Sequence, residues 1–148
     1  SPVDYAKGPA FEFGTSYTLR GESGYDVTIV TSGRGVHEAL GAADLLAEEG
    51  VTARVIDMPS VDEATLLALH DEKKPALFAE QNNGYLVSEF RRVCHAHRSA
   101  LTLDHVHAIN ALDKGKPWFV HSATYEELLS KYGLSSGQIA EACEQFAT

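Results

Sequence analysis

The stretch TSGRGVHEA, from Thr31 to Ala39, carries residue types that could bind an anion. Gly33 and Gly35 bracket Arg34 directly after the apolar run VTIV, where the pattern changes from strand to helix. A glycine turn at this point brings backbone amides together at a helix N-terminus, which is a setting that binds phosphate groups. Arg34 would add a positive charge there.

A dinucleotide-binding turn has the pattern Gly-x-Gly-x-x-Gly and an acidic residue about 20 positions later. Gly33 and Gly35 match the first two glycines, but the third position is Glu38, whose carboxylate would face the diphosphate. Asp57 stands at the end of the next expected strand, where a ribose partner would lie. Two interpretations stay open: a tight turn into the helix, or a nucleotide or small-molecule binding module that uses Ser32–Gly35.

A second polar stretch is EQNNGY, which contains Glu80, Asn82, Asn83 and Gly84. It follows an expected strand at its carboxyl end, the edge at which open α/β sheets place their functional loops. Asn-Gly also favours a left-handed turn without any ligand. A functional loop and a plain turn are both compatible with this pattern.

The histidines raise the question of a metal site. His105 and His107 share one face of an expected strand, and Cys94 adds a thiol elsewhere in the chain. No third and fourth ligands occur at metal-binding spacing, so structural histidines are the simpler interpretation. Neither Cys94 nor Cys143 has a recognisable catalytic setting, and no Gly-x-Ser-x-Gly motif occurs.

Composition narrows the class of protein. The 148 residues are 44% hydrophobic, which suits one domain with a full core. With 12 basic and 21 acidic residues the net charge is -9, which disfavours a nucleic-acid binder. Two cysteines, no apolar run long enough to span a bilayer and no signal-peptide pattern are typical of a cytoplasmic protein. Residues 1–14 are expected to be a linker or extended N-terminus that once continued upstream, and residues 15–148 an α/β domain.

Strand-like runs alternate with helical patterns, which predicts βαβ units and a mostly parallel sheet. An earlier run, Thr15 to Arg20, also has strand composition, but only Gly21 to Tyr25 separate it from the next strand. A parallel crossover needs a longer connection, so we expect this first strand to run antiparallel to the others. The other expected strands are Asp26 to Val30, Thr52 to Met58, Pro75 to Glu80 and Leu103 to Ile109.

Helices are expected after each of the later strands. In the first, Val36, Leu40, Ala43 and Ala47 share an apolar face with Leu46 beside them, and Gly50 is its expected end. A further helix is expected from Tyr85 to His97. Capping boxes, in which a Ser or Thr is followed three residues later by Glu or Gln, are expected at Ser60/Glu63, Thr124/Glu127 and Ser135/Gln138.

Taken in order, several segments resemble the C-terminal domain of the transketolase family. They are FEFGTSYTLR, DVTIVTSGRGVHEALGAADLLAEEGVTARVIDMPSVDEATLLAL, PALFAEQNNGYL and YEELLSKYGLSSGQIAEAC. The family includes transketolase, 1-deoxyxylulose-5-phosphate synthase and the β-type subunits of 2-oxoacid dehydrogenases. The resemblance runs from about Phe11 to Phe146.

The resemblance implies a three-layer α/β/α sandwich around a five-stranded mixed sheet with one antiparallel strand. It also implies that thiamine diphosphate and a divalent metal such as Mg²⁺ are held by two other domains, of the same enzyme or of a companion subunit. The expected role of this chain is structural: it packs on those domains and supports a homodimer of the full protein, with a regulatory role left open. The isolated domain is expected to be inactive.

Departures from the family pattern concern the second polar stretch. Many relatives read Glu-Glu-His or Glu-Asp-His before a glycine pair, whereas this chain keeps Glu80 and lacks the histidine. The segment after MPS is also shorter than usual. The family's diphosphate motif pairs Gly-Asp-Gly with a later Asn-Asn; no Gly-Asp-Gly precedes Asn82 and Asn83, so they are not expected to bind the cofactor.

Overall fold

The computed structural model describes residues 13–33, 35–80, 84–109, 112–113, 116–117 and 135–147. Five strands in this part of the chain form one sheet, in the order β1-β3-β2-β4-β5. β3 and β2, β2 and β4, and β4 and β5 pair in parallel. β1 pairs antiparallel with β3, and the sequence predicted that this first strand runs antiparallel to the others. The strands are β1 (Tyr17–Arg20), β2 (Val27–Thr31), β3 (Ala53–Asp57), β4 (Ala76–Ala79) and β5 (Val106–Ile109).

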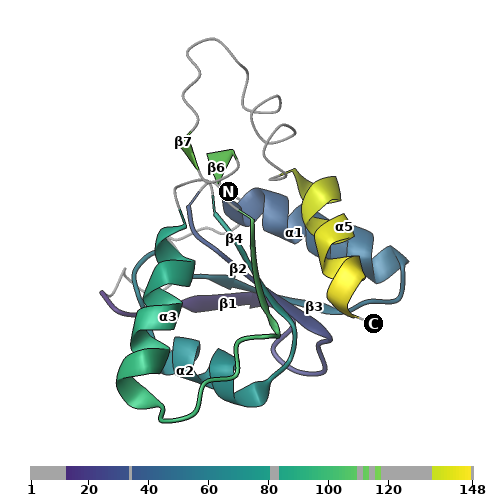
Figure 1. Ribbon diagram of the computed structural model, residues 1–148. Coiled ribbons are helices and arrows are strands. Elements are labelled where there is room, and N and C mark those ends of the chain that lie inside the picture. Colours follow the sequence, from purple (N-terminus) through teal and green to yellow (C-terminus); the bar gives the residue numbers. More distant parts are fainter. Residues whose placement is uncertain are drawn as a thin grey trace.

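Helices cover both faces of this sheet, so the predicted three-layer α/β/α sandwich is confirmed (Figure 1). One face carries α1 (Gly35–Glu48) and α5 (Ser136–Ala147), and the other carries α2 (Glu63–Glu72) and α3 (Tyr85–His97). Two short strands, β6 (Leu112–Asp113) and β7 (Lys116–Pro117), form a separate antiparallel pair. None of the described helices is long and apolar enough to cross a membrane.

The central strands explain why the sequence shows little alternation there. Every residue of β2 and β4 is buried, because helices cover both faces of the sheet at its centre. Strands buried on both sides are continuous runs of apolar and β-branched residues, as VTIVT is. At one edge of the sheet, β1 is only partly buried and its residues are more polar.

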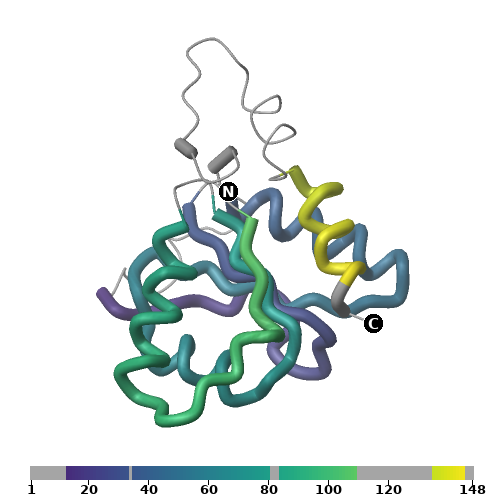
Figure 2. The backbone as a smooth tube through the Cα atoms, viewed as in Figure 1, coloured from purple at the N-terminus to yellow at the C-terminus, as the bar shows by residue number. Residues whose placement is uncertain are grey.

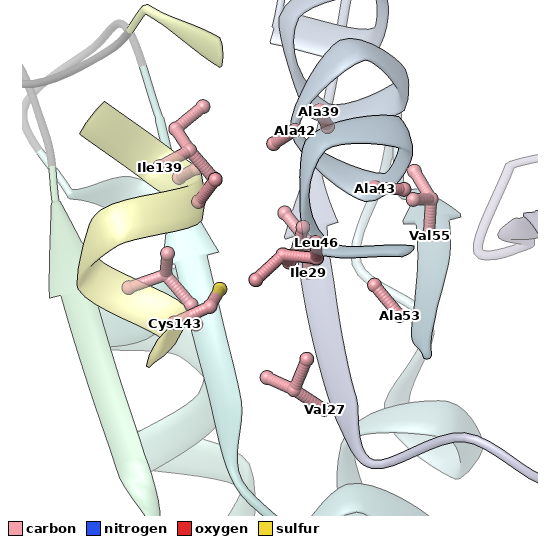
Figure 3. Close-up of a cluster of buried hydrophobic side chains, with 13 residues drawn as sticks. Val27, Ile29, Ala39, Ala42, Ala43, Leu46, Ala53, Val55, Ile139 and Cys143 are labelled. Carbon is pink, nitrogen blue, oxygen red and sulfur yellow. The ribbon is translucent and has the colours of Figure 1, made fainter. Parts of the chain in front are cut away.

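The layer formed by α1 and α5 is built from small side chains, which let the two helices lie close together. Ala39, Ala42 and Ala43 of α1 are buried in one cluster with Ile139 and Cys143 of α5. Figure 3 shows Ile139 and Cys143 pointing from α5 toward α1 and β2. The backbone trace in Figure 2 shows the two helices side by side, although most of the chain separates them in sequence.

The layer formed by α2 and α3 contains larger side chains. Phe78 of β4 and Phe90 of α3 are fully buried, and their ring centroids lie 5.4 Å apart in a tilted arrangement. Such a pair contributes about 0.5–1.5 kcal/mol beyond the area it buries. Leu66, Leu69 and Met58 belong to the same cluster. The sheet therefore has two hydrophobic cores, one on each face.

Two expected details of the helices are wrong. Ser60 does not cap α2: the N-cap is Asp62, whose side chain accepts a hydrogen bond from the Thr65 N–H, while the Ser60 hydroxyl oxygen accepts one from the Gly14 N–H. Ala47 is exposed, because the buried face of α1 runs through Ala39 and Ala42 instead.

Other expected boundaries hold within a few residues. Gly50 has a φ of +82° and ends α1, and the Val51 N–H donates to the Leu46 carbonyl oxygen. One half of the Ser135/Gln138 capping box is confirmed, since the Gln138 N–H donates to Ser135 Oγ at 3.4 Å. The Gln138 side chain differs from the expected box, because its Oε1 accepts from Ser135 Oγ at 2.9 Å. The expected cap at Thr124 lies outside the described residues.

Candidate functional site

The parallel strands end at one edge of the sheet, which we call the carboxyl edge and define by Thr31, Ser32, Gly33, Asp57 and Glu80. Thr31 and Asp57 are direct neighbours in the pairing of β2 with β3. Glu80 follows β4, and its backbone N–H donates to the Ile109 carbonyl oxygen of β5 at 2.9 Å. Open α/β sheets bind their ligands at this edge, so it is the place to test the sequence-based site.

Backbone geometry explains both glycines of the first stretch. Gly33 has a φ of +56°, in the left-handed region that favours glycine. A Cβ on Gly35 would lie 2.0 Å from Thr31 Oγ1, which no real atom tolerates. The stretch is therefore a tight turn from β2 into α1. Arg34 lies outside the described residues, so its binding of an anion stays a prediction.

Asp57 is 3% exposed and faces this turn. Burial raises the pKa of its carboxyl group from 3.8 to about 6, and a hydrogen bond from the Gly33 backbone opposes that rise. Asp57 thus lies where the dinucleotide pattern would place a ribose partner, but the turn itself is one of its hydrogen-bond partners.

Glu38 occupies the position of the third glycine of the dinucleotide-binding pattern, and its side chain is hydrogen-bonded to α5. Its carboxylate Oε2 accepts hydrogen bonds from Ser136 N–H at 3.2 Å and from Ser136 Oγ at 3.0 Å. Ser136 Oγ also donates to the Glu38 carbonyl oxygen at 2.9 Å. This residue anchors α5 on the first turns of α1 and leaves the dinucleotide pattern incomplete.

Glu80, the second buried acid of the carboxyl edge, caps α3. It is 2% exposed, and its carboxylate accepts the Leu86 N–H at 2.7 Å and the Val87 N–H at 3.2 Å. Burial raises the pKa of Glu80, while the two N–H donors oppose the rise. No local sequence pattern indicated this role, because the acid precedes the helix by more than the spacing of a local cap.

The rest of the second stretch is only partly described. Gly84 has a φ of +81°, as an Asn-Gly turn favours, and it is the N-cap residue of α3. Asn82 and Asn83 lie outside the described residues, so their part in a functional loop stays a prediction.

A hollow of about 370 Å³ lies between the β3–α2 loop and α3, and the sequence did not indicate it. Two large aromatic side chains are unusually exposed here, Phe13 at 89% and Tyr85 at 52%. Arg92, at its rim, pairs with Glu89 at 3.1 Å and with Glu63 at 3.6 Å. The lining residues are Phe13, Pro59, Ser60, Val61, Glu63, Tyr85, Glu89 and Arg92.

The histidines do not come together as a metal site in the described part of the chain. No group of three or more His, Cys, Asp or Glu side chains there could hold a metal ion. His105 precedes β5, and its Nε2 lies 3.1 Å from the Leu69 carbonyl oxygen. Cys94 and Cys143 are both buried thiols whose pKa is raised by burial, that of Cys143 to about 12.

Comparison with known proteins extends these observations. The family model described as transketolase, C-terminal domain, matches residues 16–139. A 1-deoxy-D-xylulose-5-phosphate synthase from a Synechococcus species is 36% identical over 124 residues, which are 80% of this chain and 18% of that protein. The β subunit of acetoin:2,6-dichlorophenolindophenol oxidoreductase from Cupriavidus necator is 34% identical over 109 residues, 60% of this chain and 32% of that subunit.

Solved structures agree with these relatives. A split-gene transketolase, described as an inactive β4 tetramer, superimposes with a TM-score of 0.69 and 27% identity over 93% of this chain and 43% of that chain. The transketolase of Pichia stipitis, at 19% identity and a TM-score of 0.63, shows the same fold. The chain spans less than half the length of each of these proteins. It belongs to the family of transketolase C-terminal domains.

Proposed function

We propose that this chain is the C-terminal, non-cofactor-binding domain of a transketolase-like, thiamine-diphosphate-dependent enzyme, and that its own role is structural. The family match over residues 16–139 carries this proposal, together with the small share of each curated relative that the chain spans, 18% and 32% in the two cases above. Most of each relative lies outside the matched region. The parent enzyme therefore has cofactor-binding domains, either in the same polypeptide or in a companion subunit.

The carboxyl edge supports a structural role because its acids are engaged by backbone groups of the fold itself. Asp57 is tied to the Gly33 turn, and Glu80 caps α3. Nearby, Glu38 anchors α5. A diphosphate placed here would meet these acidic side chains, so the described residues of this edge do not fit thiamine diphosphate.

The hollow beside Phe13 and Tyr85 supports packing against a cofactor-binding domain of the parent enzyme. Exposed aromatic side chains are enriched at protein–protein interfaces. The neighbouring backbone is held firmly, since the Gly14 N–H donates to Ser60 Oγ at 2.7 Å and the Ser16 N–H donates to Asp62 Oδ2 at 3.1 Å. These bonds hold residues 14–16, just before β1, in place beside the hollow.

Subunit pairing is the second part of the proposal. One relative is named as a β subunit, and one similar structure is a β4 tetramer of a split-gene transketolase. We infer that this domain helps its parent enzyme to dimerise and so affects catalysis without touching the cofactor. The chemistry belongs to thiamine diphosphate, which stabilises carbanions when two-carbon ketol units are transferred or 2-oxoacids decarboxylated.

Isothermal titration of the chain with thiamine diphosphate and Mg²⁺ tests the proposal. We expect no heat of binding, whereas micromolar binding by the chain alone would contradict it. Thermal shifts with adenine nucleotides and coenzyme A test the alternative of a free-standing nucleotide-binding module, which the matched relatives do not support. A ligand at about 100 times its dissociation constant stabilises by roughly 2.7 kcal/mol, enough to raise the melting temperature visibly.

A further inference from the structure

Two histidines fasten the last turn of α2 to the segment between α3 and β5. His70 is 4% exposed, and its Nε2 accepts a hydrogen bond from the Thr102 N–H at 3.1 Å. On its other side, His70 Nδ1 lies 2.8 Å from Asp71 Oδ1. In return, His105 Nε2 lies 3.1 Å from the Leu69 carbonyl oxygen. We call the contacts of His70 with Thr102 and of His105 with Leu69 the histidine latch.

The hydrogen-bond partners of His70 define its protonation state in the latch. A backbone N–H can only donate, so Nε2 must offer its lone pair to Thr102. A carboxylate only accepts, so Nδ1 carries the proton that is shared with Asp71. The ring is therefore neutral in this arrangement. A second proton, on Nε2, would set two N–H donors against each other inside the protein.

The charged groups around His70 offset one another. Asp71 would attract an imidazolium, but Arg98, at the end of α3, donates to both carboxylate oxygens of Asp71 at 2.9 and 2.6 Å. The Arg98 hydrogen bonds, followed by the one to His70, hold the pKa of Asp71 well below its usual range. From α3, Cys94 is a buried thiol whose pKa is raised by burial.

The next acid of α2, Glu72, is engaged elsewhere. Its carboxylate binds Arg54 at 2.8 Å and the Tyr25 hydroxyl. His105 contributes a ring whose Nδ1 is buried without a hydrogen-bond partner. The carboxylate beside His70, that of Asp71, is thus already bound by the Arg98 guanidinium. No other group in the described part of the chain compensates for the loss of the Thr102 hydrogen bond.

We propose that the His70 half of the histidine latch is a pH-sensitive contact, which holds the Thr102 backbone on α2 while His70 is neutral and releases it when His70 takes up a second proton. The release is confined to the surroundings of Thr102, because Leu101 and Leu103 still pack against the core of the α2–α3 layer. Farther along, the Ala76 N–H still donates to the His105 carbonyl oxygen at 2.9 Å. Opening is therefore local and leaves the sheet intact. It loosens the backbone around Thr102, in the segment that leads into the edge strand.

Amide hydrogen exchange at Thr102, followed by NMR on this chain, tests the latch. Protection factors, corrected for the intrinsic effect of pH, are compared at about pH 7.5 and pH 5, across the range in which imidazoles titrate. We expect Thr102 protection to fall by about tenfold or more, since a hydrogen bond is lost and a charge is buried. Amides of β2 and β4 should keep theirs. Equal losses in the strands would mean global destabilisation and overturn the proposal.

Two variants sharpen the test. H70Q keeps an oxygen acceptor within reach of Thr102 but cannot titrate, so its Thr102 protection should not depend on pH. H95Q removes an exposed histidine on α3 and should behave as the unmodified chain does. ¹⁵N shifts of the unmodified chain, which need no variant, should show the proton of His70 on Nδ1 at pH 7.5. A proton on Nε2 there, or equal pH dependence with and without His70, would rule the latch out.

Discussion

At the scale of single residues, the two buried acids of the carboxyl edge differ in how burial is compensated. Asp57 and Glu80 are both nearly inaccessible, and burial raises the pKa of each. Glu80 accepts two backbone N–H groups at a helix N-terminus, where a negative charge is favourable. For Asp57 the pKa still rises to about 6, despite the Gly33 hydrogen bond. The charge of Asp57 is therefore the costlier of the two at neutral pH.

Asp57→Asn should stabilise the domain at pH 8. In the folded state the pKa is raised above its unfolded value, so protonated Asp57 favours folding below pH 3.8 and this contribution is lost as the pH rises through about 6. Asparagine keeps an acceptor for Gly33 without the charge. We expect a gain of about 1–3 kcal/mol at pH 8, shrinking toward zero near pH 4, measured by urea unfolding.

The matched control for that experiment is Asp104→Asn, since Asp104 is exposed. It should change the free energy of unfolding by less than about 0.5 kcal/mol at either pH. A destabilised Asp57→Asn protein at pH 8 would show instead that the charge itself is needed.

Glu80→Ala should destabilise the domain by about 2–4 kcal/mol, because two buried N–H groups lose their acceptor. Glu80→Gln keeps one acceptor oxygen and should cost about half as much. Chemical unfolding gives the stability, and exchange at Leu86 and Val87 shows whether the loss is local to α3. If Gln and Ala behaved alike, the cap would depend on charge and not on hydrogen bonds.

Residue types predicted the turn but not its partners. Gly33 and Gly35 marked a tight turn, and Asp57 was placed correctly at the end of β3. The capping by Glu80 and the anchoring by Glu38 were missed, because each depends on an element that the local pattern does not contain. The hollow beside Phe13 was missed for the same reason.

At the scale of elements, the α1–α5 contact depends on one glycine. A Cβ on Gly41 would lie 2.4 Å from Ser136 Oγ and 3.1 Å from Ser136 Cβ. Gly137, in the first turn of α5, has nothing within 4 Å of the same position. The two glycines therefore make a matched pair for one substitution.

Gly41→Ala should destabilise the domain by about 1–3 kcal/mol, because α5 must shift away from α1. Gly137→Ala should be neutral or stabilise by up to about 1 kcal/mol, since alanine is the better helix former. Thermal unfolding of both variants decides the matter. If Gly41→Ala were as stable as Gly137→Ala, the close approach of the helices would not matter for stability.

Helix starts show why element boundaries were harder to predict than element types. Ser60/Glu63 and Asp62/Thr65 both place a capping residue three positions before a polar one. Asp62 is the cap, and it also accepts a 2.8 Å hydrogen bond from Ser16 Oγ, in the segment before β1. That contact joins residues 46 positions apart, and a local sequence pattern does not contain it.

At the scale of the whole molecule, each of the two hydrophobic cores contains one cysteine, whose reactivity can be used to follow the unfolding of that core. Cys94 is buried in the core beneath α3, and Cys143 in the core between α5 and the sheet. Both should resist alkylation in the folded protein, because burial keeps the thiols protonated and inaccessible. Alternating strands and helices predicted the mostly parallel sheet, and the family resemblance implied its three layers, but the neighbour of β1 could not be inferred from its own residues.

Pulsed thiol labelling in urea should show both cysteines becoming reactive at the same denaturant concentration. The sheet is shared by the two cores, so we expect one cooperative transition, as in most domains of this size. Mass spectrometry of the labelled peptides resolves the two sites. Labelling of Cys143 well before Cys94 would show that α5 detaches as a separate unit.

The place of β1 in the sheet has a consequence for synthesis on the ribosome. β1 leaves the exit tunnel before β2, yet it hydrogen-bonds to β3, which is made only after all of β2 and α1. The nascent β1 therefore has no strand to pair with until β2, α1 and then β3 have been synthesised. Its polar, half-buried residues suit that delay, because an apolar strand left waiting at the tunnel mouth would invite aggregation.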